Sequence, residues 1–291
     1  MIKERMILPA FPLIASFRGR MSKIEVRKQI KHLTLYKFLL SLIHIIYGFL
    51  PCSGYADHKP KTSNNSPIYI VYHVGILNNW QEIMEEQLEA LTSSGLLEAS
   101  AQLIVCFVGD DTPIIYSLLE NTPYTNKIQI VHASEDLSVC EFPSIALVKE
   151  IAEHHGDAKI LYFHSKGVMH FNKPTEGPIR DWRLYMEYFL IHHWKTCIET
   201  LNNYDICGVN WGRGHPWLRR GFPHFSGNFW WACADYIKTL PELPKPYLFE
   251  NRLDCEWFIG KNSSQNRVKT FHQSRENHHI NLYPRDKYAY D

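Results

Sequence analysis

Four short clusters of polar residues carry the side chains whose chemistry could support binding or catalysis. The first, His164-Ser165-Lys166-Gly167, directly follows the apolar run 158–163. An imidazole, a hydroxyl and an ammonium group at the end of one strand can together hold a diphosphate, and the glycine lets a ligand approach the backbone closely. Solvated side chains at a polar strand end are the alternative interpretation.

The second cluster, Arg180-Asp181-Trp182-Arg183, opens a long amphipathic segment. A guanidinium group recognises phosphate or carboxylate through two parallel hydrogen bonds, which makes Arg183 a candidate ligand of an anion. Asp181 could instead cap the N-terminus of the helix that this segment predicts, and Arg183 could be an ordinary surface charge.

The third cluster lies in the run HFSGNFWW, residues 224–231. Gly227 between Ser226 and Asn228 indicates a tight turn that presents hydroxyl and amide groups, with aromatic rings such as Trp230 beside it. Aromatic rings that keep a polar edge are suited to stacking against other rings, sugar rings included. A buried aromatic strand is the alternative.

The fourth cluster is Asp254-Cys255-Glu256-Trp257. A carboxylate at a helix start beside a cleft can act as a general base when its pKa matches the task. The helix dipole alone also favours an acidic residue there. Among the 16 histidines, the adjacent pairs have no zinc-ligand partner at a useful spacing, and only His272 is kept as a candidate metal ligand.

These clusters need a scaffold, and the hydrophobic pattern predicts an α/β fold. Apolar runs predict strands over 68–74, 101–108, 127–132 and 158–163. Amphipathic spacing predicts helices over 79–91, 114–119 and 142–154. This alternation indicates a mostly parallel central sheet with helices on both faces. Ligands of such folds bind beyond the carboxyl ends of the strands, where His73 and His164 stand.

The second half of the chain changes character. One long helix is predicted, followed by short strands and helices separated by loops and a proline-marked connector. The predicted helices cover 181–201 and 234–240 and begin again at 256; the predicted strands cover 205–210 and 268–272; a loop is expected over 212–223.

Composition and missing motifs exclude several classes of protein. The chain has 31 Lys and Arg against 30 Asp and Glu, a net charge of +1 that does not predict an electrostatically driven nucleic-acid partner. The seven cysteines form no CxxC pair, so we interpret most of them as small buried residues. GxGxxG, the P-loop, HExxH and GxSxG are absent, and the chemistries that depend on them lose support.

Residues 1–56 differ from the rest of the chain. A basic stretch precedes the apolar run 38–50 and small residues up to Ala56, which fits a secretory signal cleaved after Ala56. Alternatively, the run is a marginal single-span or peripheral membrane anchor, or a helix packed on the domain. We therefore expect a membrane-associated or secretory protein, with a cytoplasmic location as the alternative. Residues 57–66 are predicted as a linker, and 67–291 as the folded domain.

An ordered series of motifs then resembles a known family. KILYFHSKGV, DWRLYMEYF, DICGVNW, HFSGNFWWA and DCEWFIG are similar to motifs of GT-A-like glycosyltransferases from surface-polysaccharide loci, which are distantly similar to rhamnan-synthesis F proteins. The resemblance covers about residues 67–291. It implies an enzyme on a GT-A-like fold that moves a sugar from a nucleotide-sugar donor to a glycan or lipid-linked acceptor.

The resemblance also implies roles for individual residues. His73 would border the nucleotide base. The diphosphate would be contacted by His164, Ser165, Lys166 and Arg183. The sugar and acceptor cleft would be lined by Ser226, Gly227, Asn228 and Trp230. The base would be Glu256 or Asp254, and His272 would stand where many GT-A enzymes place a late metal-ligating histidine.

One departure from the family pattern leaves metal dependence open. Ordinary GT-A enzymes end the strand in Asp-x-Asp, which holds Mn²⁺ or Mg²⁺ on the diphosphate, whereas this chain has His164-Ser165-Lys166 there. The Lys166 ammonium could take over part of that charge neutralisation. Two alternatives to a transferase remain: a catalytically silent carbohydrate-binding protein on the same fold, and a nucleotide-sugar hydrolase.

Overall fold

The computed structural model describes residue 60 and residues 62–212, 222–262 and 267–289. The chain divides into a unit of residues 1–42 and a unit of residues 43–291, and all that follows concerns the second. The predicted signal or anchor segment lies outside the described residues. Among the helices that the structure describes, none has the length and apolar character needed to cross a bilayer.

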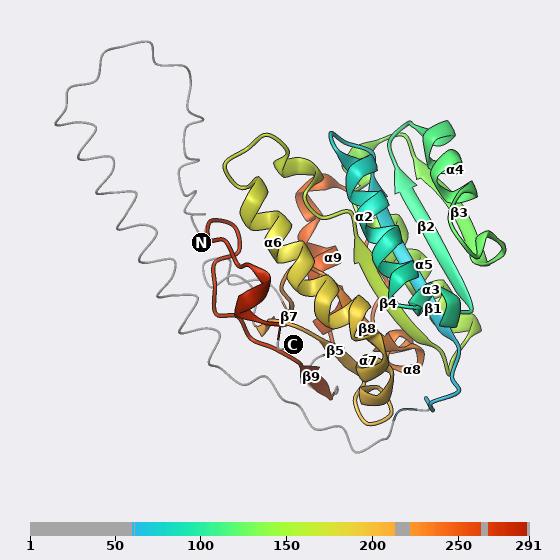
Figure 1. Cartoon of the computed structure of the whole chain (residues 1–291). Helices are drawn as coiled ribbons and strands as arrows, with labels where there is room; N and C mark the ends of the chain where they lie inside the picture. Colours follow the sequence, from blue (N-terminus) through green and yellow to red (C-terminus); the bar gives the residue numbers. More distant parts are fainter. Residues whose placement is uncertain (1–59, 61, 213–221, 263–266, 290–291) are drawn as a thin grey trace, which may run out of the picture. The chain divides into compact units, whose positions relative to one another are not determined.

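A seven-stranded sheet forms the centre of the domain, in the order β3-β2-β1-β4-β8-β5-β9 (Figure 1). Neighbouring strands run parallel except β8, which is antiparallel to both β4 and β5. The prediction of an α/β fold with a mostly parallel sheet is thereby confirmed. The strands are β1 Ile68–Gly75, β2 Gln102–Val108, β3 Ile128–Ser134, β4 Lys159–His164, β5 Ile206–Gly208, β8 Trp230–Cys233 and β9 Val268–Thr270. A separate two-stranded ladder pairs β6 Trp211–Gly212 with β7 His224–Phe225.

Helices cover both faces of the sheet, as the sequence predicts. Successive strand residues point to opposite faces. Tyr72 of β1 lies near the charges of Arg183 and Glu187 on α6, while His73 bonds to Ser144 of α5, so α6 and α5 lie on opposite faces. Figure 1 shows α2 and α6 together in front of the sheet. The helices are α2 Trp80–Ser93, α3 Leu96–Ala99, α4 Thr112–Glu120, α5 Phe142–His154, α6 Glu176–Glu187, α7 Trp194–Thr200, α8 Ala234–Lys238 and α9 Leu253–Trp257.

The long helix predicted over 181–201 is wrong in its start and in its continuity. It begins at Glu176, because Pro178 falls in the first turn, where a helix does not need the proline's missing N–H. It is interrupted by a π-helical turn, Tyr188–His192, before α7. Asp181 is therefore no N-cap: its carboxylate accepts a hydrogen bond from the Tyr283 amide at 2.9 Å.

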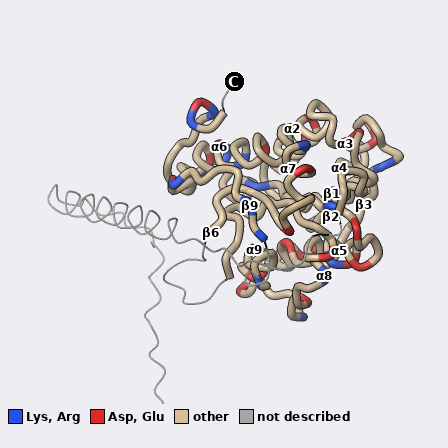
Figure 2. The backbone as a smooth tube through the Cα atoms, turned by 90° about the horizontal axis from the view of Figure 1, so that it is seen from below, with Lys and Arg blue, Asp and Glu red and all other residues tan. Residues whose placement is uncertain are grey.

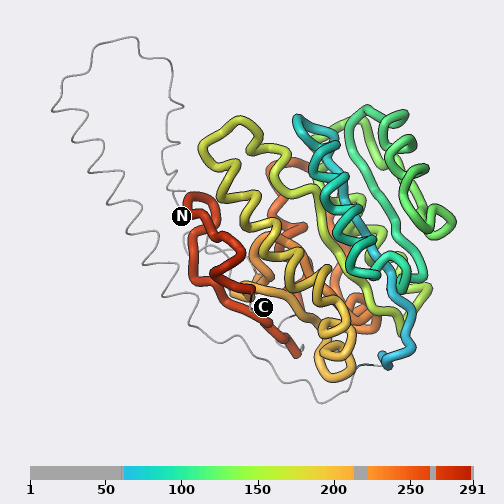
Figure 3. The backbone as a smooth tube through the Cα atoms, in the orientation of Figure 1, coloured from blue at the N-terminus to red at the C-terminus, as the bar shows by residue number. Residues whose placement is uncertain are grey.

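The C-terminal segment completes this side of the domain by running beside α6 (Figure 3). At the other end, Thr62 is 8% exposed and its hydroxyl donates to the Leu201 carbonyl oxygen at 2.7 Å. Thr62 and Ser66 of the predicted linker 57–66 are therefore buried against the domain, whereas residues 63–65 between them are exposed. Lys and Arg are interspersed with Asp and Glu along the described backbone (Figure 2).

Candidate active site

His164, the last residue of β4, is hydrogen-bonded to the bend that precedes β8. Its Nε2 lies 3.1 Å from the carbonyl oxygen of Gly227. Burial, reinforced by the charge of Lys166, lowers the pKa of His164 to about 3, so the ring is neutral at pH 7. A carbonyl oxygen can only accept, so the proton sits on Nε2 and Nδ1 keeps its lone pair. The 4.0 Å approach of Nδ1 to Glu141 is consequently no ion pair.

Lys166 supplies the positive charge of this region. Its Nζ lies 4.0 Å from the centroid of the Trp182 ring on α6, a cation–π distance. Burial lowers the pKa of Lys166, whereas the carboxylates of Glu256 and Glu141 act in the opposite direction. An ammonium group that contacts an indole and feels the charge of two carboxylates is thus placed just past the carboxyl end of β4.

The bend at residues 225–228 is held against α6. The Asn228 amide donates to the Phe225 carbonyl oxygen at 3.0 Å, and Gly227 between them has a φ of +96°. A Cβ on Gly227 would lie 2.5 Å from Met186 Sδ and 3.1 Å from Trp182 Cε2. Only glycine fits both this backbone conformation and this space.

Glu141, which sequence reasoning missed, connects three elements at the floor of the site. Its Oε2 accepts a hydrogen bond from Tyr162 Oη of β4 and one from Asn228 Nδ2, each at 2.6 Å. Glu141 directly precedes α5 and is half-buried. A carboxylate at a loop-to-helix junction was the available signal, but the tyrosine and asparagine that it binds are distant in the sequence.

Trp230 supports the bend from behind. The ring is fully buried and stacks on Tyr162 with centroids 5.1 Å apart, while its Nε1 donates to Asn228 Oδ1 at 3.0 Å. Trp230 is thus held inside the sheet in this structure, and its predicted place in a sugar cleft stays a prediction. The buried aromatic strand, the alternative for this run, describes Trp230 correctly.

Of the two acidic residues of α9, Glu256 is the one coupled to this cluster. Its charge raises the pKa of both His164 and Lys166, against the larger effect of burial. Asp254 faces Lys261 instead, with Oδ1 3.8 Å from Nζ. Glu256 is thus the better placed of the two candidate bases.

His73 near the end of β1 and Ser165 just after β4 hydrogen-bond to neighbouring parts of the protein. The His73 ring, whose residue is 5% exposed, bonds through Nδ1 to Ser144 Oγ at 2.8 Å, and burial lowers its pKa to about 4. Ser165 is also buried, and its Oγ accepts from the Gly75 amide at 3.0 Å. Both side chains are buried in this structure, and their predicted contacts with the nucleotide and the diphosphate stay predictions.

Arg183 is committed to a buried ion pair between α2 and α6. Its Nη2 lies 2.6 Å from Glu86 Oε2 and its Nη1 3.5 Å from Glu187 Oε1, with the side chain 3% exposed. A guanidinium in this position neutralises two carboxylates of its own protein, of which Glu187 is buried and Glu86 is 30% exposed. The predicted contact with a diphosphate is therefore not supported by the position of Arg183.

The structure provides no ligand set around His272. Its Nδ1 is 3.0 Å from the Tyr185 hydroxyl, and its ring stacks on Phe189. Across the described residues, no three His, Cys, Asp or Glu side chains converge as metal ligands. The metal role of His272 stays a prediction, as does the cleft role of Ser226, whose amide donates to the Asn210 carbonyl oxygen at 3.1 Å.

Five of the predicted site residues are therefore brought together, namely His164, Lys166, Gly227, Asn228 and Glu256. They come from β4, the bend before β8 and α9, which are far apart in the sequence. Glu141 joins them as a sixth member, and we call these six residues the β4-end cluster. The cluster contains one ammonium, one neutral imidazole and two carboxylates within mutual electrostatic range.

Several solved structures are similar to this chain at low identity. HddC from Yersinia pseudotuberculosis is 13% identical with a TM-score of 0.40, over 72% of this chain and 91% of that one. HddC complexed with GMP-PN is 12% identical with a TM-score of 0.39, over 70% and 89%. 4-Diphosphocytidyl-2C-methyl-D-erythritolsynthase from Anaerococcus prevotii is 12% identical with a TM-score of 0.36, over 76% and 94%.

No curated protein matches the chain in sequence. One family model does match it, over residues 69–291, and its description is "Domain of unknown function". The matched region contains the whole β4-end cluster and every strand and helix described above except the first residue of β1, Ile68. Since it covers well over half of the chain, the protein belongs to this family, DUF8361.

Proposed function

We propose that the protein is a GT-A-like glycosyltransferase that moves a sugar from a nucleotide-sugar donor to a glycan or lipid-linked acceptor in polysaccharide biosynthesis. The observation that carries the proposal is the convergence of Lys166, the bend at 225–228 and Glu256 at the carboxyl end of β4. Open α/β sheets bind ligands at that end of their strands. The ordered series of motifs that resembles the family runs through the same residues.

In this proposal Lys166 binds the donor diphosphate. Its ammonium can donate up to three charge-assisted hydrogen bonds to phosphate oxygens. His164 adds an uncharged acceptor at Nδ1, which suits a hydroxyl group better than an anion because the ring is neutral. The Gly227 carbonyl is already occupied by His164, so the bend contributes mainly the shape of the wall.

For an inverting transfer, the bonds and charges balance as follows. The oxygen of an acceptor hydroxyl attacks the anomeric carbon of the donor while the bond from that carbon to the diphosphate oxygen breaks. The electron pair of the broken bond leaves with the nucleoside diphosphate, where the Lys166 charge stabilises it. The Glu256 carboxylate takes the proton of the attacking hydroxyl.

The net charge of the β4-end cluster bears on whether the proposed transfer needs a divalent cation. One ammonium stands against two carboxylates in the β4-end cluster, so the cluster carries an excess of negative charge before a diphosphate arrives. Mn²⁺ or Mg²⁺ brought in by the diphosphate would offset that excess. We therefore include a divalent cation in the proposal as a variable of the assay.

The segment 1–56 would bring the domain to its acceptor. Its basic and apolar character suits a secretory signal or a membrane anchor, and a lipid-linked or surface glycan is made at a membrane. A fusion of residues 1–66 to a reporter protein tests this point. Membrane or secreted fractions containing the reporter support the proposal, and a soluble cytoplasmic reporter rejects it.

The decisive experiment measures nucleotide release from a panel of nucleotide sugars, with and without Mn²⁺, in the presence and absence of glycan acceptors. Nucleotide released only when an acceptor is present supports transfer. Nucleotide released without an acceptor identifies a hydrolase. Failure to bind any nucleotide sugar, by calorimetry on the same samples, favours a catalytically silent carbohydrate-binding protein.

A further inference from the structure

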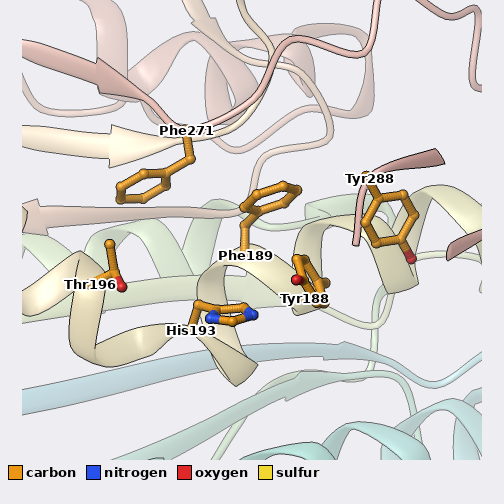
Figure 4. Close-up of a pocket in the computed structure, with 6 residues that line it drawn as sticks. All are labelled: Tyr188, Phe189, His193, Thr196, Phe271 and Tyr288. Atoms are coloured by element: carbon orange, nitrogen blue, oxygen red, sulfur yellow. The ribbon is translucent and has the colours of Figure 1, made fainter. Parts of the chain in front are cut away.

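A pocket lies beside the π-helical turn that separates α6 from α7, outside the β4-end cluster. Its volume is about 220 Å³, and Figure 4 shows the six side chains around it. None of the six belongs to the β4-end cluster. The lining residues are Tyr188, Phe189, His193, Thr196, Phe271 and Tyr288.

The π-helical turn builds one side of this aromatic pocket. The turn spans Tyr188–His192, between α6 and α7, and it contributes Tyr188 and Phe189 to the lining. Phe271 comes from just beyond β9, and Tyr288 from the C-terminal segment. Single π-helical turns are rare and occur frequently at functional sites. Three separate parts of the chain therefore meet around this turn.

Packing fixes the rings that line the pocket. Phe189 stacks on His272 with centroids 5.5 Å apart, and Tyr188 meets the His193 ring edge-on at 4.5 Å. Tyr288 is 3% exposed and meets Tyr188 at 5.4 Å. A pocket whose walls are already ordered loses little side-chain entropy when a ligand binds.

The lining combines flat apolar faces with polar groups at the edge. Figure 4 shows the phenyl rings of Phe271 and Phe189 along one side of the hollow and His193 with Thr196 along the other. A sugar ring has the same division, because its C–H face can stack on an aromatic ring while its hydroxyls hydrogen-bond to polar neighbours. A purely apolar ligand would leave the imidazole and the hydroxyl unused.

The volume limits the ligand to a single ring. Pockets for drug-sized molecules measure about 300–1,000 Å³, and this one is smaller. We propose that the aromatic pocket binds one sugar residue of a glycan. The proposal goes beyond the glycosyltransferase function, since it concerns binding alone and holds whether or not the protein transfers sugars.

Binding is tested by saturation-transfer NMR with methyl glycosides of glucose, galactose, rhamnose and N-acetylglucosamine, with phenol as an apolar probe. Thr196→Trp fills the pocket from an exposed helix position without removing any packed side chain. Lys195→Trp, the same substitution at the adjacent exposed position, is its control. Phe271→Ala removes a wall of the pocket, and Phe249→Ala, at a phenylalanine 44% exposed elsewhere, is the control for it.

We expect at least one glycoside to bind the unchanged protein. Its affinity should fall by about tenfold or more in Thr196→Trp and Phe271→Ala and stay within about twofold in the two controls. Binding of phenol without any glycoside overturns the proposal, as does the absence of all binding. Glycoside binding that survives Thr196→Trp locates the sugar elsewhere and overturns it equally.

Discussion

The His164 imidazole donates from Nε2 to the Gly227 carbonyl oxygen at 3.1 Å, so one side chain fastens the end of β4 to the bend before β8. The backbone ladder between these strands has its last pair at Tyr162 and Trp230. The imidazole therefore continues the connection beyond the ladder, at the position where the sheet opens toward the β4-end cluster. The bend at 225–228 is thereby tied to the end of a sheet strand.

Replacing Glu256 by Gln should remove sugar transfer while leaving the fold intact. The amide has nearly the shape of the carboxylate but cannot take a proton from the acceptor hydroxyl. Loss of a general base lowers kcat by about 10²–10⁴-fold. Turnover is measured by nucleotide release, and folding by circular dichroism and thermal melting.

Glu250→Gln is the matched control, because Glu250 is an exposed acidic residue just before α9. It should keep full activity. Full activity in Glu256→Gln would reject Glu256 as the base without touching the assignment of the fold.

Replacing Lys166 by Gln should weaken binding of a nucleoside diphosphate. Loss of charge-assisted hydrogen bonds to the diphosphate corresponds to a decrease in affinity of about tenfold to a hundredfold. Calorimetry with UDP and GDP measures the change. Lys173→Gln, at an exposed lysine, controls for a general loss of positive charge.

The affinity of the unchanged protein should also depend on pH in a defined direction. Burial lowers the pKa of Lys166, so the ammonium loses its proton at a lower pH than an exposed lysine does. The protonated form binds the anion, and affinity should therefore fall as the pH is raised through this lowered pKa. Lys166→Gln should lose this dependence; an identical alkaline decline in both proteins would assign it to another group.

Replacing Gly227 by Ala should destabilise the domain. The new methyl group would meet Met186 Sδ at 2.5 Å, and the residue would keep a φ of +96° that side chains rarely adopt. Strain of this kind costs about 1–3 kcal/mol of unfolding free energy. Urea denaturation measures the loss. Gly212→Ala, where nothing lies within 4 Å of the new Cβ, should change stability far less, and equal effects would contradict the steric argument.

The central strands β1, β2 and β4 could be predicted from the sequence because they are buried on both faces, whereas the edge strand β3 has no fully buried residue. Strands buried on both faces read as continuous apolar runs, and Gln102–Val108 and Lys159–His164 begin and end within a residue of prediction. The start of α6 could not be predicted so well. Glu176-Gly177-Pro178 contains two residues typical of turns, and only the packed helix shows that its first turn tolerates them.

The sequence predicted which residue types the site contains better than it predicted which side chains contact one another. Arg183 carries the group that binds phosphate, but the sequence does not reveal that Glu86, 97 positions earlier, already neutralises it. Glu141 was missed for the same reason, since its partner Asn228 is 87 positions away. Local patterns indicate which side chains can do chemistry, and the long-range contacts decide which of them remain free to do it.

Two buried histidines should make the domain sensitive to mild acid. Burial lowers the pKa of His73 to about 4 and that of His164 to about 3, against about 6.5 for an exposed imidazole. Between these values and pH 6.5 the unfolded chain binds more protons than the folded domain. The free energy of unfolding therefore falls as the pH is lowered through this range and is fully present above it.

In the unchanged protein, His73 Nδ1 lies 2.8 Å from Ser144 Oγ. Replacing His73 by Asn removes one of these titrations and keeps a side-chain nitrogen that can bond to Ser144 Oγ. The His73 titration should contribute about 3 kcal/mol to the loss of stability between pH 6.5 and pH 4. Urea denaturation at half-unit pH steps should thus give a shallower slope for His73→Asn, even if its stability at pH 7 is lower. His154→Asn, at an exposed histidine, should retain the original slope. Equal slopes in all three proteins would mean that His73 titrates alike in the folded and unfolded states, and that its burial does not exclude the proton.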